Sequence, residues 1–137
     1  MAVQFDFGLA VGEPVWFRPL FTAMVKLLDL PPNSNSHGAR PLELKALEFG
    51  MNLVLETMRR GSPLPAVLAL PRGGVQMEWH AGGINFEVAA SPVGHFTIYL
   101  EGSDRCAPTG EAIELEGGLA DVRDPTAYTL AELAHRA

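Results

Sequence analysis

Polar side chains able to exchange protons or hydrogen bonds recur at alternate positions between residues 76 and 99. They are Gln76, Glu78, His80, Asn85, Glu87, Thr97 and Tyr99. Carboxylates beside an imidazole and a phenol can do acid–base work when a fold holds them close together. The same groups can form a hydrogen-bonding surface for another protein, or a face that simply contacts water. The pattern leaves these three interpretations open.

Metal binding is poorly supported by the sequence. A zinc site would have to combine His80 and His95 with Glu78 or Glu87, and no H-x-H or C-x-x-C spacing is present. His37, next to a glycine in a polar segment, is typical of a turn. We therefore expect no metal and no cofactor.

Nucleophilic and phosphate-binding motifs are equally weak. Cys106, the single cysteine, would need a nearby histidine and a lowered pKa to act as a nucleophile, so we expect a structural or exposed thiol. The pairs Gly73-Gly74 and Gly82-Gly83 do not open a helix with the Lys and Ser/Thr of a phosphate loop. Both are typical of hairpin turns.

The strands that would position these side chains show apolar–polar alternation. Residues 75–80, 84–88 and 96–100 each alternate, which predicts strands with one buried and one wet face and puts Trp79 in the core. Residues 67–70 and 113–116 predict two further strands. The buried sides are expected to be Val75, Met77 and Trp79, then Ile84, Phe86 and Val88, then Phe96, Ile98 and Leu100.

Polarity also predicts a register for the hairpins. A two-residue loop at Ala81-Gly82 pairs Trp79 with Ile84, Met77 with Phe86, Gln76 with Glu87, and Glu78 with Asn85. In the next hairpin Phe86 pairs with Ile98, Val88 with Phe96, Glu87 with Thr97, and Asn85 with Tyr99. Sliding the first pairing by two residues would oppose Glu78 and Glu87, and like charges directly opposed destabilise a sheet.

Two helices are predicted before the strands. Apolar residues at helical spacing indicate one over about 17–29, with Pro19 in its first part and Pro31-Pro32 ending it. A second begins at Pro41 and ends with Arg59, Arg60 and a Gly61 cap. Gly50 inside it predicts a close contact with a neighbouring element.

The two ends of the chain complete the predicted organisation. Residues 1–13 read as an apolar arm or an edge strand. Asp124-Pro125 predicts the N-cap and first position of a C-terminal helix over 124–136. The chain is then a single domain over 1–137, with a helical part over 14–61 and an antiparallel meander over 66–116.

Charge and composition exclude several classes of function. The net charge of −6 disfavours nucleic-acid binding, and the cluster Arg59, Arg60 and Arg72 reads better as a helix terminus. No apolar run is long enough to span a membrane, and the N-terminus lacks the pattern of a secretory signal. A lone cysteine suits a reducing compartment, so we expect a cytoplasmic protein.

Two segments resemble a widespread set of small, uncharacterised bacterial proteins. Their pattern is N-W-D-x-Y-G-A, a helix, G-G-x-x-x-E-W, and a hairpin rich in L-E-x-E. The residues that match are Asn33, Gly38, Ala39, Gly73, Gly74, Glu78 and Trp79. Ser34, Asn35 and His37 replace the Trp, Asp and Tyr of that pattern, and Phe86-Glu87-Val88 stands for L-E-x. The resemblance covers about half the chain; it implies helices followed by a meander and a bacterial or phage setting, and brings no activity.

The sequence thus predicts an α+β fold with two N-terminal helices packed on an antiparallel meander of four to five strands, and a short C-terminal helix. The favoured function is a non-enzymatic interaction module of the antitoxin, immunity or accessory-subunit type. Its partner would be another protein or a second copy of the chain, bound through the polar sheet face or the N-terminal arm. The alternative is a small hydrolase or metal-dependent enzyme that uses Glu78, His80, Glu87 and Tyr99.

Overall fold

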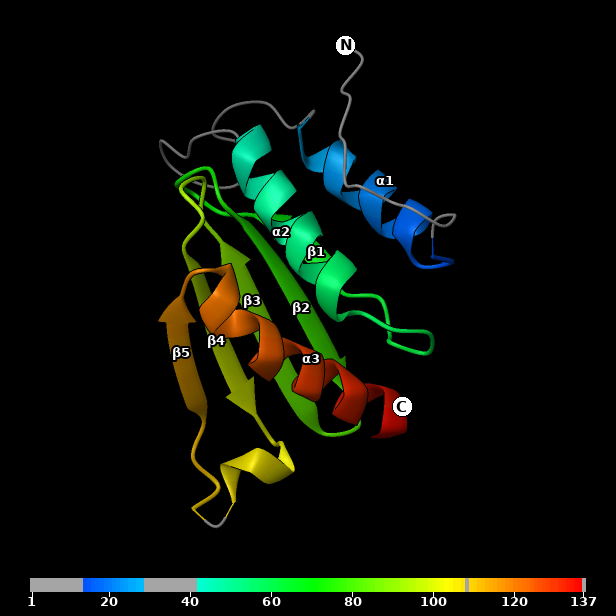
Figure 1. Ribbon diagram of the computed structural model, residues 1–137, viewed down its shortest axis with the longest axis vertical. Helices are drawn as coiled ribbons and strands as arrows, with labels where there is room; N and C mark the ends of the chain where they lie inside the picture. Colours follow the sequence, from blue (N-terminus) through cyan, green and yellow to red (C-terminus); the bar gives the residue numbers. More distant parts are fainter. Residues whose placement is uncertain (1–13, 29–41, 108, 137) are drawn as a thin grey trace.

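The protein is an α+β domain in which a meander of five antiparallel strands is covered by helices (Figure 1). The computed structural model describes residues 14–28, 42–107 and 109–136. The elements in chain order are α1 (Phe17–Leu28), α2 (Leu44–Thr57), β1 (Ala66–Ala69), β2 (Val75–Ala81), β3 (Ile84–Ala90), β4 (Phe96–Glu101), a 3-10 turn (Asp104–Cys106), β5 (Ile113–Gly117) and α3 (Leu119–Arg136). The predicted fold class is confirmed.

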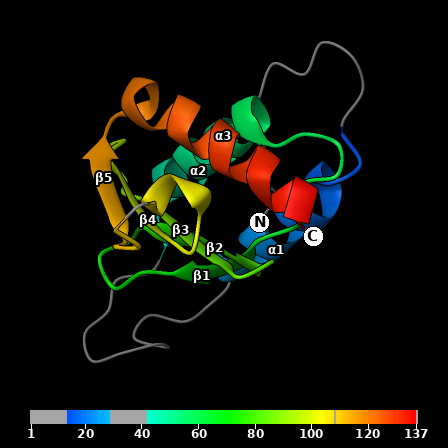
Figure 2. The same cartoon turned by 90° about the horizontal axis from the view of Figure 1, so that it is seen from below.

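The helices of the described residues cover one face of the sheet. The strand order is β1-β2-β3-β4-β5, with neighbouring strands antiparallel throughout. Helix α2 contacts β2 and β3, α3 contacts β4 and β5, and α1 packs beside β1 and against α2. Seen along the sheet, α2 and α3 lie on the same side, and no described helix lies on the other (Figure 2). We call this side, which none of the described helices covers, the open face.

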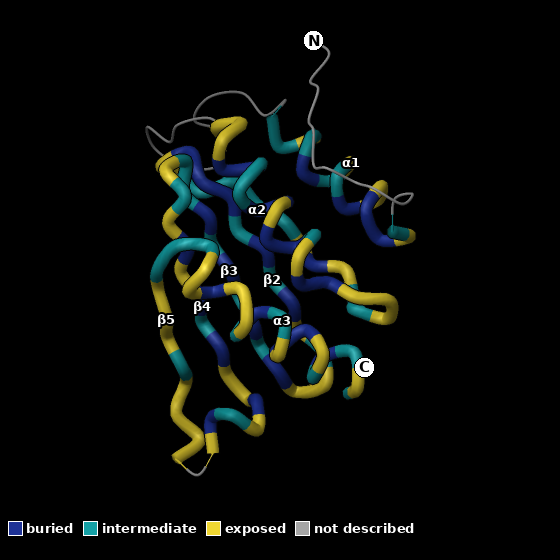
Figure 3. The backbone as a smooth tube through the Cα atoms, in the orientation of Figure 1, coloured by how far each residue is buried: buried dark blue, intermediate teal, exposed yellow. Residues whose placement is uncertain are grey.

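The core lies between the helices and the inward side of the sheet. Burial alternates strictly along β2 and β3, as the polarity of their sequences predicts (Figure 3). Trp79 is 1% exposed, packs against Phe86 at a ring-centroid distance of 5.3 Å, and donates its indole N–H to the carbonyl of Pro63 at 2.8 Å. A buried indole needs such a partner, and this one ties the segment before β1 to the centre of the sheet.

Gly50 marks the place where α2 comes closest to the sheet. A Cβ at this position would lie 3.2 Å from Cγ1 of Val75, closer than most side-chain contacts. The prediction of a tight contact at Gly50 is confirmed. Because Gly50 has no side chain, α2 can pack closely against β2.

The predicted register of the hairpins is wrong by two residues. Trp79 pairs with Phe86 rather than Ile84, and the two-residue loop is Gly82-Gly83. In the next hairpin Phe86 pairs with Leu100 rather than Ile98. Because a shift of two residues preserves which side chains share a face, the predicted faces hold although the partners change.

The corrected register opposes the two carboxylates that the prediction kept apart. Glu78 faces Glu87 directly, and His80 faces Asn85. The Gly82-Gly83 turn explains the choice, since both residues have positive φ, 59° and 80°. Turns of this kind match the twist of the flanking strands and favour glycine at both positions.

Two helix boundaries also differ from the predictions. Helix α2 ends at Thr57, with Met58 already extended, so Arg59 and Arg60 lie beyond the helix rather than at its C-terminus. Residues 58–65, which include Pro63, connect the end of α2 to β1. Both arginines are exposed, and the last turn of α2 contains no basic residue that could interact with the helix dipole.

The C-terminal helix is present but begins at Leu119, not at Asp124. Its start is capped by Asp121, whose Oδ2 accepts the backbone N–H of Gly118 at 2.9 Å. A carboxylate that reaches back in this way satisfies one of the free N–H groups at a helix start. Pro125 consequently lies inside the helix, where it removes a backbone hydrogen bond.

Some predictions fall outside the described residues. These are the N-terminal arm or strand over 1–13, the turn at His37, and the part of the resemblance carried by residues 33–39.

Candidate functional site

The open face carries all seven residues predicted to form a site. Three strands supply them: Gln76, Glu78 and His80 from β2, Asn85 and Glu87 from β3, and Thr97 and Tyr99 from β4. Each side chain alternates with a buried core residue, which fixes its direction away from the helices. The fold therefore brings the predicted residues together on one surface.

Gln76 connects the opposed carboxylates of β2 and β3. Its Nε2 donates to Oε1 of Glu87 at 3.0 Å and more weakly to Oε2 of Glu78 at 3.4 Å. The amide thus places a shared donor between two negative groups. This arrangement offsets the repulsion that direct opposition of two glutamates would otherwise cause.

His80 lies between two acceptor oxygens. Its Nε2 is 3.3 Å from Oε1 of Glu78, and its Nδ1 is 2.8 Å from Oδ1 of Asn85. The amide orientation of Asn85 is set on its other side, where Nδ2 donates to Oε1 of Glu101 at 3.0 Å. A neutral imidazole has only one N–H, so both contacts are hydrogen bonds only when the ring is protonated.

The pKa of His80 follows from this geometry. The hydrogen bond to Asn85, and then the hydrogen bond to and charge of Glu78, raise the pKa of His80 above 6.5. Both ring nitrogens face acceptor oxygens of the protein, so neither is directed at a substrate. This feature argues against the acid–base interpretation of the face.

Glu101 is a member of the network that the sequence analysis missed. Its Oε2 accepts the hydroxyl of Tyr99 at 2.8 Å, while Oε1 accepts Asn85. The hydrogen bonds from Tyr99 and then Asn85 lower the pKa of Glu101, and the bond to Glu101 raises the pKa of Tyr99. The signal was available: Glu101 continues the alternation of Thr97 and Tyr99, but the predicted strand stopped one residue too early.

When His80 is protonated, a continuous chain of hydrogen bonds crosses the face. It runs through Glu87, Gln76, Glu78, His80, Asn85, Glu101 and Tyr99. Six of the seven predicted residues belong to it. Thr97 does not, and lies exposed on β4 opposite Glu116.

Negative charge is concentrated on this side of the sheet. Five glutamates project from it: Glu78, Glu87, Glu101, Glu114 and Glu116. The five strands contain neither lysine nor arginine. Without these five, the whole sequence has eleven acidic residues against ten basic ones, so the excess negative charge of the protein resides largely on the open face.

The C-terminal helix holds one end of this face in place. The guanidinium of Arg136 donates to the carbonyls of Gly82 and Gly102 at 3.2 and 3.1 Å. It also pairs with Asp104 at 2.7 Å and with Glu132 at 3.0 Å. These contacts fix the turn between β2 and β3 and the residue after β4, which are close in sequence to His80, Asn85 and Glu101.

Glu132 completes this anchor. It accepts the hydroxyl of Ser103 at 2.6 Å and the backbone N–H of Asp104 at 3.0 Å. Partial burial alone would raise the pKa of Glu132, but these two hydrogen bonds and the charge of Arg136 outweigh it and lower the pKa.

The remaining candidate residues are dispersed. His80 and His95 lie at opposite ends of the sheet, and within the described ranges no three His, Cys, Asp or Glu side chains are grouped so as to hold a metal. Cys106 is buried, with its sulfur 3.7 Å from the carbonyl of Leu100. None of the helices in the described part of the chain has the length and apolarity needed to cross a bilayer.

Comparisons of the chain with protein-family models, with curated proteins and with solved structures gave no match. The chemistry of the open face is therefore the basis for inferring a function.

Proposed function

We propose that the protein is a non-enzymatic interaction module that binds another protein through the open face. The observation that carries the proposal is the hydrogen-bonded chain of polar side chains across β2, β3 and β4. It holds these groups in fixed directions before any partner arrives, which lowers the conformational entropy lost on binding. Such a prearranged polar surface suits recognition of a complementary surface.

The alternative function, a small hydrolase or metal-dependent enzyme, has less support from the geometry of the open face. Glu78 and His80 are within reach of each other, but both nitrogens of the imidazole already face acceptor oxygens. The side chains lie on a sheet face that no helix of the described ranges covers, whereas small-molecule sites usually enclose most of the ligand surface. We therefore propose no enzymatic activity.

A partner protein fits better than a second copy of the chain bound face to face. Two open faces in contact would bring five glutamates of each copy together, and like-charge juxtaposition at an interface is costly. The proposed setting, a bacterial or phage cytoplasm with the antitoxin, immunity or accessory-subunit type of role, follows from the resemblance and the single cysteine.

Charge reversal on the open face tests the proposal. We would express tagged wild-type protein, the variant Glu87→Lys/Glu114→Lys, and the control Glu48→Lys/Glu111→Lys in the source cells, and quantify co-purifying proteins by mass spectrometry. The control changes the net charge equally at positions outside the open face. The proposal predicts at least one stoichiometric partner retained by the wild type and the control and lost by the open-face variant, with thermal unfolding confirming that all three are folded. Equal retention by both variants would contradict it.

A further inference from the structure

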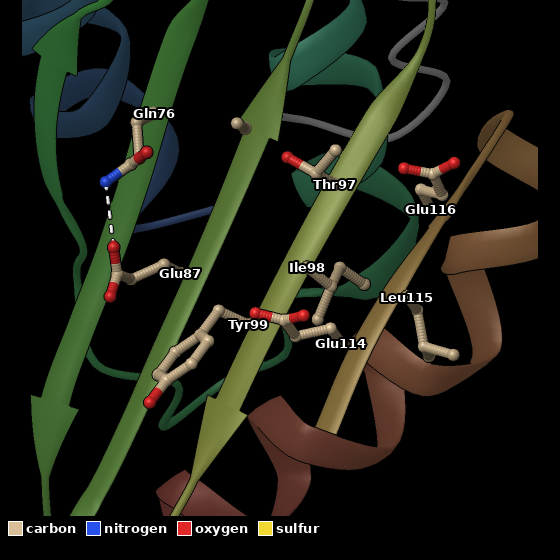
Figure 4. A pocket seen from close by; sticks show the side chains of 9 residues that line it. Gln76, Glu87, Thr97, Ile98, Tyr99, Glu114, Leu115 and Glu116 are labelled. Carbon is tan, nitrogen blue, oxygen red and sulfur yellow. Dashed lines mark hydrogen bonds between the residues drawn. The ribbon is translucent and has the colours of Figure 1, made fainter. Parts of the chain in front are cut away.

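A hollow lies on the open face where β3, β4 and β5 run side by side, and it is the feature most specific to one kind of ligand. Its volume is about 440 Å³, and its polar lining includes Gln76, Glu87, Thr97, Tyr99, Glu114 and Glu116. The close-up shows the three carboxylates distributed around it, with the ring of Tyr99 between Glu87 and Glu114 (Figure 4). The hollow is thus framed by negative groups and one aromatic ring.

Except for the hydroxyl of Thr97, the side-chain hydrogen-bond donors that line the hollow are already used within the protein. Both hydrogens of the Gln76 amide are directed to Glu87 and Glu78, and the hydroxyl of Tyr99 is directed to Glu101. These groups therefore offer little to a ligand that needs donors. Apart from the Thr97 hydroxyl, which can donate or accept, the hollow presents acceptor oxygens.

Two of its carboxylates are largely unengaged. Within the described ranges the carboxylate of Glu114 makes no hydrogen bond or ion pair, and that of Glu116 has only His95 at 3.9 Å. Glu87 uses Oε1 for Gln76. Acceptor oxygens thus approach the hollow from β3 and from β5, on two sides of the ring of Tyr99.

We propose that the hollow binds the guanidinium group of an arginine on the partner protein. Arginine supplies five N–H donors and no acceptor, in a flat arrangement that matches carboxylates on two sides and can stack on an aromatic ring. Lysine supplies a compact, strongly hydrated charge that uses this geometry less well. Since the hollow is open to solvent, a free small cation would keep most of its surface in water, whereas an arginine on a protein brings the rest of the interface with it.

This inference rests on the proposed function and names the partner chemistry of the same face. Two observations support it. The strands contain neither lysine nor arginine, so the open face is complementary in charge to a cation. The donors of Gln76 and Tyr99 are directed at carboxylates within the network. The inference predicts that arginine lies at the centre of the partner surface.

The test uses three short peptides in which arginine, lysine or citrulline alternates with serine, so that the long side chains share one side of an extended chain. Binding to the full-length protein would be followed by fluorescence anisotropy, and by amide chemical-shift changes in ¹⁵N spectra. We expect the arginine peptide to bind about threefold or more tightly than the lysine peptide, and citrulline to show no binding. The shifts should concentrate at Ala89, Thr97, Tyr99 and Glu114.

Matched variants separate a specific site from general attraction. Glu114→Gln and Glu87→Gln should each weaken the arginine peptide by about fivefold, while Glu48→Gln, with the same change in net charge on α2, should change it by less than about twofold. Glu114 is exposed on β5, so we expect Glu114→Gln to fold. This variant therefore still tests the inference if Glu87→Gln unfolds. Equal weakening by all three variants, or equal binding of arginine and lysine, would overturn the inference.

Failure of this inference is distinguishable from failure of the proposed function. If no peptide binds but the natural partner is still lost on Glu87→Lys/Glu114→Lys, the arginine inference is overturned and the interaction module stands. If that variant keeps the partner, the proposed function itself is overturned.

Discussion

Glu78 and Glu87 stand directly opposite each other on β2 and β3, and Gln76 donates its amide to a carboxylate oxygen of each, at 3.4 and 3.0 Å. Gln76→Ala removes the shared donor and leaves two opposed negative groups. We expect a loss of about 1 kcal/mol in the free energy of unfolding, measured by urea denaturation. In a Glu87→Gln background the two negative charges no longer oppose each other. Gln76→Ala should then lower the free energy of unfolding by clearly less. An identical cost in both backgrounds would show that Gln76 does not mediate the pair.

The titration of His80 provides the second prediction. Its raised pKa means that the folded state holds the proton more tightly than the unfolded state, so His80 stabilises the fold fully below about pH 6.5 and loses this contribution as pH rises through the folded pKa. NMR of the His80 ring should show a midpoint above 6.5. Asn85→Ala removes the largest cause and should move the midpoint down. An unchanged midpoint in that variant would contradict the assigned role of Asn85.

Alternation in the sequence was sufficient to predict which side chains share a face, but not which residues are opposed. A slip of two residues keeps every side chain on its face, so burial cannot distinguish the two registers. Repulsion between Glu78 and Glu87 disfavours the observed register, but the Gln76 amide donates to both carboxylates and offsets that repulsion. The glycines at 82 and 83 were the better guide, because their positive φ values select the turn.

The start of α3 was mispredicted for a similar reason. Asp124-Pro125 has the residue types of a helix start, but Gly118 and Asp121 form the N-terminal cap that the chain uses. Tertiary contacts of Val122 with the core favour the earlier start, since this side chain is fully buried. The grouping of the seven candidate residues on one face followed from the alternation alone. Glu101, which shares that face, was missed because the predicted strand ended at Leu100.

Pro125 lies within α3, and its position gives the third prediction. A proline inside a helix lacks one backbone N–H and crowds the preceding turn. Pro125→Ala should restore the hydrogen bond to the preceding turn and raise the free energy of unfolding by about 1 to 3 kcal/mol. The carbonyl that accepts Arg105 at 3.3 Å and the Thr129 hydroxyl at 2.8 Å is retained in this variant. A lower melting temperature would mean that the proline ring itself makes the larger contribution through packing.

The fourth prediction concerns the carboxylate of Glu132. Its pKa is lowered in the folded state, so its contribution is present above its ordinary pKa of 4.5 and is lost as pH falls through the folded value. Glu132→Gln should therefore reduce stability by about 2 kcal/mol near neutral pH, and the difference from the wild type should shrink in acid. Glu111→Gln, in an exposed loop, serves as the control and should follow the wild type. A constant difference at all pH values would indicate a packing role in place of an electrostatic one.

The central claim, that the open face is where a partner protein binds, is tested most directly by site-specific photo-crosslinking in the source cells. A photo-reactive phenylalanine derivative would replace Thr97, which is exposed on the open face, or Asn52, which is exposed on α2. The account predicts a defined adduct from position 97 with a protein whose crosslinked surface is basic, and no such adduct from position 52. The same adduct from both positions, or one from position 52 alone, would contradict it.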